Sequence, residues 1–235
     1  MSKPVFLLGA SPDTEIRLRD FYDDGPNTVV DMLRNPGQVR HSGWDLRTYD
    51  EPRVEKASYL EVGRSDHKLI RLYPDGTLAL RGAGDDDLLT WATRKSGLKG
   101  LLRVNPVVLA ELSYSFVLFY SRLHSFFDRE PQYIQFQIGL RNAISDEGTR
   151  LCVVPAEVNT WGFESPRHGE LHEAPGKEMD ENVKALWDDV KTSPEAVSYG
   201  VVEAFYLWFG VKTDRIPYVR KNGKREIDIE KIASL

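Results

Sequence analysis

A long aromatic-rich segment between Asn105 and Phe127 constrains the fold more than any other part of the chain. Pro106 suits the first turn of a helix, where a backbone N–H has no partner within the helix, and Asn105 can cap that helix. Apolar residues then recur at helical spacing, and others spread onto the remaining faces: Val108, Leu112, Tyr114, Phe116, Phe119, Leu123 and Phe127, with Val117, Leu118 and Tyr120. A helix that is apolar on nearly all sides is buried. The sequence therefore predicts a buried central helix over residues 107–127.

The same segment is long enough to raise a transmembrane interpretation, but Glu111, Arg122 and His124 lie inside it, and charges within lipid are costly. The N-terminal apolar run, Val5 to Leu8, is too short for the core of a signal peptide. The single cysteine, Cys152, excludes an intramolecular disulfide and a cysteine-based zinc site. We therefore expect a cytoplasmic protein with no membrane association.

The order of the remaining elements predicts the fold class. Pro74-Asp75-Gly76 is a turn signal between two strand-like runs, so residues 57–82 are expected to form antiparallel strands. Residues 133–140 and 151–154 follow as strands, and 178–191 and 194–209 as helices. The predicted class is α+β, with a mainly antiparallel sheet packed on the long buried central helix and two further C-terminal helices.

The N-terminal part differs in composition from the rest. Prolines and glycines punctuate residues 1–55 at short intervals, which is typical of turns and irregular chain. The sequence therefore predicts two parts, an irregular N-terminal arm over 1–55 and a single α+β domain over 56–235. A short helix is expected within the arm around Val29 to Leu33.

Two basic clusters stand out from a chain whose net charge is -5. The first surrounds the loop before the central helix and the second lies on a C-terminal hairpin: Arg94, Lys95, Lys99 and Arg103, and Arg220, Lys221, Lys224 and Arg225. If the clusters converge, they could follow a phosphate backbone or bind an acidic protein. Solvated turns are the alternative interpretation. Nucleic-acid binding that depends on electrostatic attraction alone would require a chain with positive net charge, whereas this chain is acidic.

A candidate metal site lies at His168, Glu170 and His172. On a helix, histidines four residues apart share one face, as zinc sites require. Pro166 and Gly169 argue against a helix, so a polar surface loop is the alternative. No other residue pattern specifies a cofactor.

Two further patterns could be catalytic. Asp45, Glu55 and Lys56 can be fitted to a nuclease pattern of acids and a lysine on neighbouring strands, which could hold Mg²⁺. With 36 acidic residues in the chain, such a match arises easily by chance. Cys152 lies in an apolar strand, which favours a buried structural thiol over a nucleophile.

Several segments together resemble a known family: Gly43–Leu46, Leu69–Thr77, Asn105–Leu112, Trp208–Gly210 and Ile216–Tyr218. They look like the C-terminal portion of bacterial predicted DNA-binding or ATP-binding proteins of the Schlafen AlbA type, over about residues 40–220. The strand signature of the AlbA-type domain is absent from this chain. The resemblance therefore implies an accessory module that senses or docks in regulation or defence, and it assigns no residue to nucleic-acid binding, nucleotide binding or cleavage.

The leading interpretation is a non-enzymatic bacterial module that binds another macromolecule, either a protein or a nucleic acid. One alternative is a metal-dependent hydrolase or nuclease. Another is a structural subunit of a larger assembly, in which the chain would form an oligomer.

Overall fold

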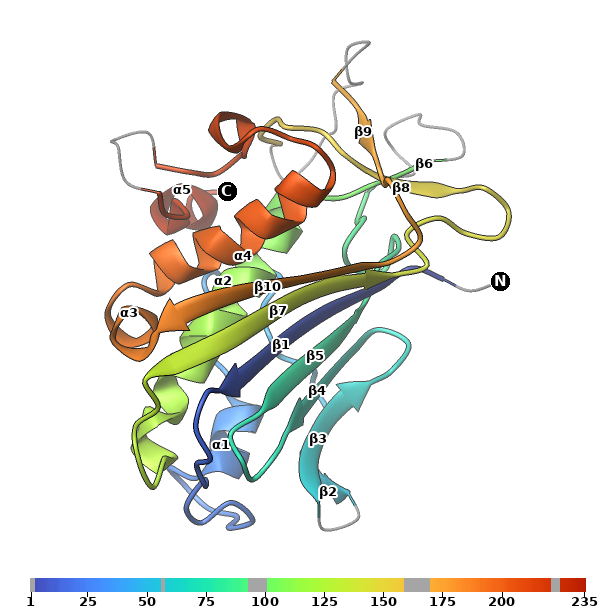
Figure 1. Cartoon of the computed structure of the whole chain (residues 1–235). Coiled ribbons are helices and arrows are strands. Elements are labelled where there is room, and N and C mark those ends of the chain that lie inside the picture. Colours follow the sequence, from blue (N-terminus) through green and yellow to red (C-terminus); the bar gives the residue numbers. More distant parts are fainter. Residues whose placement is uncertain (1–2, 56–57, 93–100, 159–169, 221–224) are drawn as a thin grey trace.

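The computed structural model describes residues 3–55, 58–92, 101–158, 170–220 and 225–235. The fold is mixed α/β with a large antiparallel sheet, which confirms the sheet type predicted from the sequence. Seven strands pair in the order β10-β7-β1-β5-β4-β3-β2 (Figure 1). They are β1 (Val5–Pro12), β2 (Arg53–Glu55), β3 (Tyr59–Arg64), β4 (Lys68–Leu72), β5 (Leu78–Ala83), β7 (Tyr133–Arg141) and β10 (Met179–Leu186).

The predicted hairpin forms between β4 and β5 around Pro74-Asp75-Gly76. Gly76 adopts a positive φ of 78°, and the Asp75 carboxylate accepts a hydrogen bond from the Thr77 N–H at 2.9 Å. Glycine reaches this conformation without a steric penalty, and an aspartate side chain stabilises the backbone two residues on. Local turn chemistry therefore fixes this hairpin.

Residues 1–55 do not form the irregular arm that the sequence predicted. β1 lies inside the sheet and pairs antiparallel with β5 on one side and β7 on the other. The short apolar run that includes Val5 to Leu8 has the length of a buried strand, and pairing on both sides satisfies its backbone groups. The short helix expected in this region is confirmed as α1 (Val29–Arg34), capped by the Thr28 hydroxyl.

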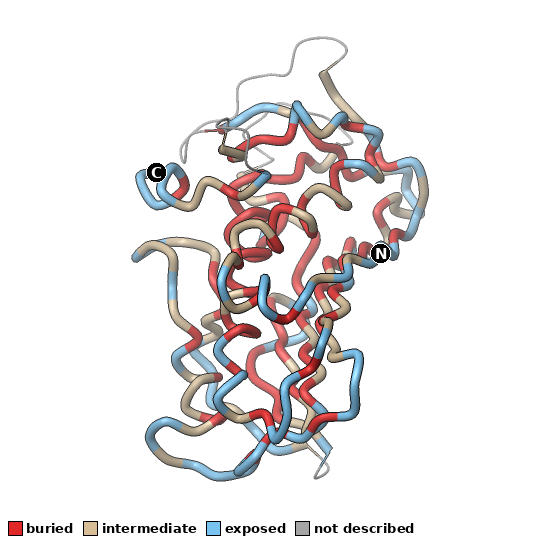
Figure 2. The backbone as a smooth tube through the Cα atoms, turned by 60° about the vertical axis from the view of Figure 1, so that its left-hand side comes forward, coloured by how far each residue is buried: buried red, intermediate tan, exposed pale blue. Residues whose placement is uncertain are grey.

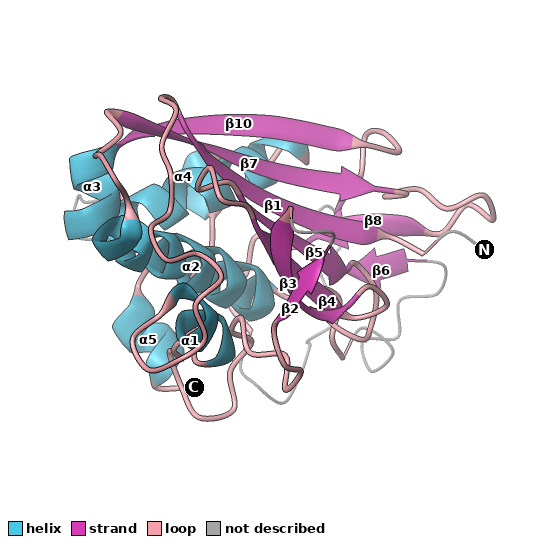
Figure 3. Ribbon diagram, turned by 90° about the horizontal axis from the view of Figure 1, so that it is seen from below, coloured by secondary structure: helices cyan, strands magenta, loops and turns pink. Residues whose placement is uncertain are grey.

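Five α-helices occur in the described residues, and they gather on one side of the sheet (Figure 3). The longest is α2 (Pro106–Arg122), followed by a 3-10 turn over Leu123–Phe126. The Asn105 side chain accepts hydrogen bonds from the N–H groups of Val107 and Val108 at 3.0 and 3.4 Å, which confirms the predicted cap.

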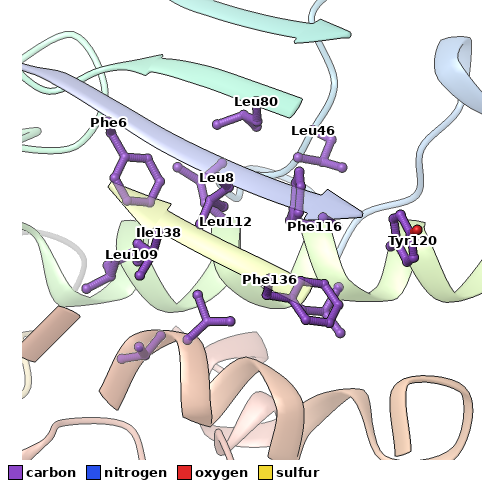
Figure 4. Close-up of a cluster of buried hydrophobic side chains, with 14 of the residues drawn as sticks. Phe6, Leu8, Leu46, Leu80, Leu109, Leu112, Phe116, Tyr120, Phe136 and Ile138 are labelled. Carbon is purple, nitrogen blue, oxygen red and sulfur yellow. The ribbon is translucent and has the colours of Figure 1, made fainter. Parts of the chain in front are cut away.

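Burial of α2 is nearly complete, as its sequence predicted: every residue from 106 to 121 is buried except half-buried Leu118 (Figure 2). Its apolar side chains belong to the same hydrophobic cluster as those of the strands (Figure 4). The Tyr120 and Phe136 rings, for example, meet edge to face with centroids 5.9 Å apart.

The segment before β2 is fastened to α2 by a buried ion pair. Arg40 Nε and one terminal nitrogen contact the two oxygens of Glu111 at 2.9 and 3.1 Å, and the Trp44 N–H donates to the same carboxylate at 3.1 Å. The Glu111 side chain is 1% exposed and that of Arg40 is 10% exposed. Two-point pairing with an additional N–H donor is the arrangement in which a buried carboxylate is tolerated.

The C-terminal half departs from the prediction in one place. The expected helix over 178–191 is mostly the strand β10, and only its end is helical, as α3 (Trp187–Thr192). The expected helix over 194–209 is confirmed as α4 (Pro194–Trp208), and a short α5 (Ile229–Ala233) follows. Glu, Lys and Ala favour a helix locally, but pairing with β7 along the whole length of β10 prevails over that propensity.

A second, three-stranded sheet lies at one end of the main sheet (Figure 1). Its strands are β6 (Leu101–Arg103), β8 (Arg150–Val153) and β9 (His172–Glu173), in the order β6-β8-β9. β8 confirms the strand expected over 151–154.

Candidate partner-binding edge

One long edge of the main sheet has no strand beside it in the described part of the chain. That edge is β10, which pairs with β7 alone. The other edge, β2, is three residues long, whereas β10 has eight and contains no proline. Natural sheets usually shorten or interrupt an edge because it presents unpaired backbone groups. β10 therefore differs from β2 in being long enough to accept another strand.

The hydrogen-bond phase of β10 follows from its register. The Trp187 N–H donates to the Gln132 carbonyl at 3.0 Å, and Leu186 lies opposite Tyr133 in the same register. Bonded pairs alternate along an antiparallel ladder, so the odd-numbered residues of β10 bond to β7. The even-numbered residues direct their N–H and C=O groups away from the sheet: Asp180, Asn182, Lys184 and Leu186.

A groove of about 570 Å³ runs beside this edge, between β10 and the helices α3 and α4. The groove is lined by Tyr133, Val183, Lys184, Ala185, Leu186, Asp189, Ser193, Ala196, Val197 and Gly200. We call it the β10–α4 groove. Most of its side chains are small or apolar, so it fits apolar side chains better than charged ones.

Small residues on α4 set the dimensions of the groove. A Cβ built on Gly200 would lie 3.3 Å from Cγ1 of Val183, so the helix approaches the strand more closely than most side chains would allow. Ala196 lies one turn earlier on the same face of the helix. The opposite face of α4 is anchored in the core, where the Phe205 and Phe6 rings meet with centroids 6.3 Å apart. The floor of the groove is therefore held in place.

Two charged side chains beside the groove are engaged within the protein, and two others, Lys184 and Asp189, belong to its lining. Asp180 pairs with Arg141 at 2.8 Å, and Lys191 pairs with Glu130 at 3.0 Å, an interaction whose hydrogen bond raises the pKa of Lys191. The Lys184 ammonium lies 3.8 Å from the centroid of the Tyr133 ring, a cation–π contact. Lys184 thus places a positive charge beside the free edge.

Three of the eight residues in the predicted basic clusters lie in the described part of the chain: Arg103, Arg220 and Arg225. Arg94, Lys95, Lys99, Lys221 and Lys224 lie outside the described residues. Arg103 is 3% exposed, and burial lowers its pKa.

On the C-terminal side, Arg220 pairs with Glu226 at 3.2 Å and Arg225 with Glu203 at 3.8 Å. The described members of both clusters are therefore buried or offset by carboxylates.

The predicted metal ligands are not assembled in the described part of the chain. His168 lies outside it, and His172 contacts the Phe209 carbonyl through Nδ1 at 3.2 Å. Glu170 is half-buried at the start of the described stretch that precedes β9. Among described residues, no group of three or more His, Cys, Asp or Glu side chains is placed to hold a metal ion. The metal site stays a prediction.

The two catalytic patterns also have structural explanations. Asp45 is 4% exposed and pairs with Arg47 at 2.7 Å, Glu55 lies on β2, and Lys56 is outside the described residues. Cys152 is buried, and burial raises the pKa of its thiol to about 12. Because the thiolate is the nucleophilic form, this cysteine is unreactive at neutral pH.

Sequence reasoning missed the residues of the β10–α4 groove. A signal was present, since Met179, Val183, Ala185 and Trp187 alternate with polar residues, as in a half-buried strand. Glu181 interrupts that alternation and gives the segment a helical appearance.

Compared with models of protein families, with curated proteins and with solved structures, the chain shows no match. No helix in the described residues is long and apolar enough to cross a membrane.

Proposed function

We propose that this chain is a non-enzymatic interaction module that takes up an extended segment of another protein as an additional strand beside β10. The observation that carries the proposal is the coincidence of the free edge with an apolar groove along it. Strand addition of this kind draws affinity from backbone hydrogen bonds and specificity from pockets that receive alternate side chains.

The geometry of an added strand follows from the edge. Four residues of β10 offer an N–H and a C=O each, which allows about eight hydrogen bonds worth about 1 kcal/mol apiece. Ordering a flexible segment costs about 1 kcal/mol or more per residue. Backbone bonds alone therefore do not give useful affinity, and the side chains that enter the groove must supply it.

The groove also favours a single extended segment over a second copy of this chain. Ala196, Val197 and Gly200 of α4 form the floor beside the free edge. A β10 strand from a second copy would carry its own α4 on the same face of the joined sheet, where the two helices would crowd the groove. An isolated segment carries no such helix, so it occupies the edge without that conflict.

We further propose that α2 is the central support on which the sheet packs, as its sequence predicted. The supporting observation is the continuous hydrophobic cluster that joins Leu109, Leu112 and Phe116 of α2 with Phe6 and Leu8 of β1 (Figure 4). A rigid support keeps the β10 edge in its bound geometry before a partner arrives, which lowers the cost of binding.

The proposal favours a protein partner over nucleic acid, because the described members of the two basic clusters are buried or ion-paired. It agrees with the accessory docking role that the Schlafen AlbA-type resemblance implies. It also leaves aside the hydrolase alternative, which no described cluster of side chains supports.

Selection of random peptides displayed on phage tests the proposal without knowledge of the natural partner. Peptides selected on the wild-type protein are expected to share alternating apolar residues. Two variants block the site differently: Asn182→Pro removes an outward N–H, and Ala196→Leu fills the groove.

Asn182→Ala is the matched control, because it removes the side chain and keeps the N–H. We expect the selected peptides to bind Asn182→Ala like the wild type and to lose binding to the other two variants. Absence of any enriched peptide, or peptides that bind all variants equally, would refute strand addition at β10.

A further inference from the structure

The face of the sheet opposite the helices carries a hollow of about 430 Å³, separate from the β10–α4 groove. Its lining includes Gly9, Ala79, Leu7 and Leu69 at the floor and Arg71, Arg81, Tyr73 and Gln137 around it. We call it the Arg81 hollow. Its volume lies within the range typical of small-molecule sites.

The register of four strands explains why the face is hollow here. Gln137, Gly9, Ala79 and Arg71 lie side by side on β7, β1, β5 and β4. The two inner positions have the smallest side chains and the two outer ones have long polar side chains. Strands are about 4.8 Å apart, so the outer backbones are separated by about 14 Å. A flat group of one or two fused rings fits between them.

The charge at the hollow is positive. The Arg81 side chain donates to the Ser65 carbonyl at 2.9 Å and makes no ion pair with any described residue. Glu61 pairs with Arg71 at 2.8 Å and with Arg53 at 3.1 Å, and Arg53 also lies 4.0 Å from Glu55, so the excess positive charge at the hollow belongs to Arg81. Arg71 also lies over the Tyr59 ring at 5.1 Å, which holds it in place.

We infer that the Arg81 hollow binds a planar aromatic carboxylate. The ring lies on the floor formed by Gly9 and Ala79, the two positions of this row with the smallest side chains. The carboxylate accepts hydrogen bonds from Arg81, whose planar guanidinium matches a carboxylate at two points. Gln137 bounds the opposite side: its Nε2 donates to the Asp180 carboxylate at 3.4 Å, and its Oε1, which lies 3.5 Å from the position that a Cβ on Gly9 would take, offers an acceptor to a second substituent.

Titration of the 15N-labelled protein with 2-naphthoate, followed by amide and arginine Nε–H NMR signals, tests the site. Saturable shifts are expected at Gly9, Ala79 and Arg81. The neutral analogue 2-naphthamide and the variant Arg81→Gln are each expected to weaken binding about tenfold or more, since a charge-assisted pair is lost.

Two further variants separate the site from general effects. Gly9→Val fills the floor with a residue that strands favour, and it is expected to abolish binding while the spectrum stays folded. Arg53→Gln lies outside the lining and is expected to leave the affinity within about twofold of wild type. Absence of saturable shifts, equal affinity for acid and amide, or binding that survives both Arg81→Gln and Gly9→Val would overturn the inference.

Discussion

A pair of proline substitutions in adjacent residues of β10 tests the assigned direction of its backbone groups. Asn182 is expected to direct its N–H away from the sheet, so Asn182→Pro removes no ladder hydrogen bond. Proline is tolerated on an edge strand in this orientation. Val183 lies opposite Phe136 in the bonded phase, so Val183→Pro removes a ladder bond and places the proline ring against β7.

The expected difference in the free energy of unfolding is large. Losing the Val183 N–H leaves a carbonyl of β7 without its partner, and together with the steric conflict this costs about 3 kcal/mol or more. Asn182→Pro is expected to cost less than about 1 kcal/mol, because only a solvent-facing group is lost. Val183→Ala and Asn182→Ala serve as controls that subtract the loss of each side chain.

Urea unfolding followed by tryptophan fluorescence measures all four variants, since the chain contains five tryptophans. The account predicts a much lower midpoint for Val183→Pro than for Val183→Ala, and similar midpoints for Asn182→Pro and Asn182→Ala. If Asn182→Pro is the more damaging proline, the assigned phase is wrong and the proposed binding edge with it.

Three further predictions concern stability. Burial lowers the pKa of Lys68 to about 8 from its ordinary 10.5, so between these pH values only the unfolded state holds the proton. The free energy of unfolding of the wild type, relative to that of Lys68→Met, is therefore expected to rise by up to about 3 kcal/mol from pH 7 to pH 10. If urea titrations show the same difference at both pH values, Lys68 is not buried as described. Glu111→Ala leaves Arg40 buried without its carboxylate and is expected to lower the free energy of unfolding by about 3 kcal/mol or more. In the same assay the double variant Arg40→Ala/Glu111→Ala is expected to recover part of that loss. If the effects of the two single substitutions simply add in the double variant, the two side chains do not stabilise each other. Gly200→Ala gains up to about 1 kcal/mol of helix propensity, but its Cβ meets Val183 at 3.3 Å. Calorimetry is therefore expected to show little net change in stability. A loss of stability comparable to that of Glu111→Ala would mean that β10 and α4 cannot shift to make room for the methyl group.

The parts of the fold that the sequence predicted correctly are those specified locally. Asn105 and Pro106 define the start of α2, Pro74 to Gly76 define the β4–β5 hairpin, and the alternation in β7 identifies that strand. Each of these signals lies within a few residues of the feature that it determines. Their prediction therefore needs no knowledge of distant segments.

β1 and β10 were missed because their partners are distant in sequence. β1 pairs with β5 and β7, and β10 contains enough helix-favouring residues to conceal its apolar alternation. Without β10 as a strand there is no free edge and no groove against α4. The Arg81 hollow likewise depends on the side-by-side placement of Gly9 and Ala79, which come from strands about 70 residues apart in the sequence.

Hydrogen exchange along β10, with and without a selected peptide, tests the central claim most directly. In the free protein the amides of Glu181, Val183 and Ala185 are expected to exchange slowly, and those of Asn182 and Lys184 rapidly. Bound peptide is expected to slow the exchange of Asn182 and Lys184 specifically. If a peptide binds and these two amides continue to exchange rapidly, the partner does not add a strand at this edge.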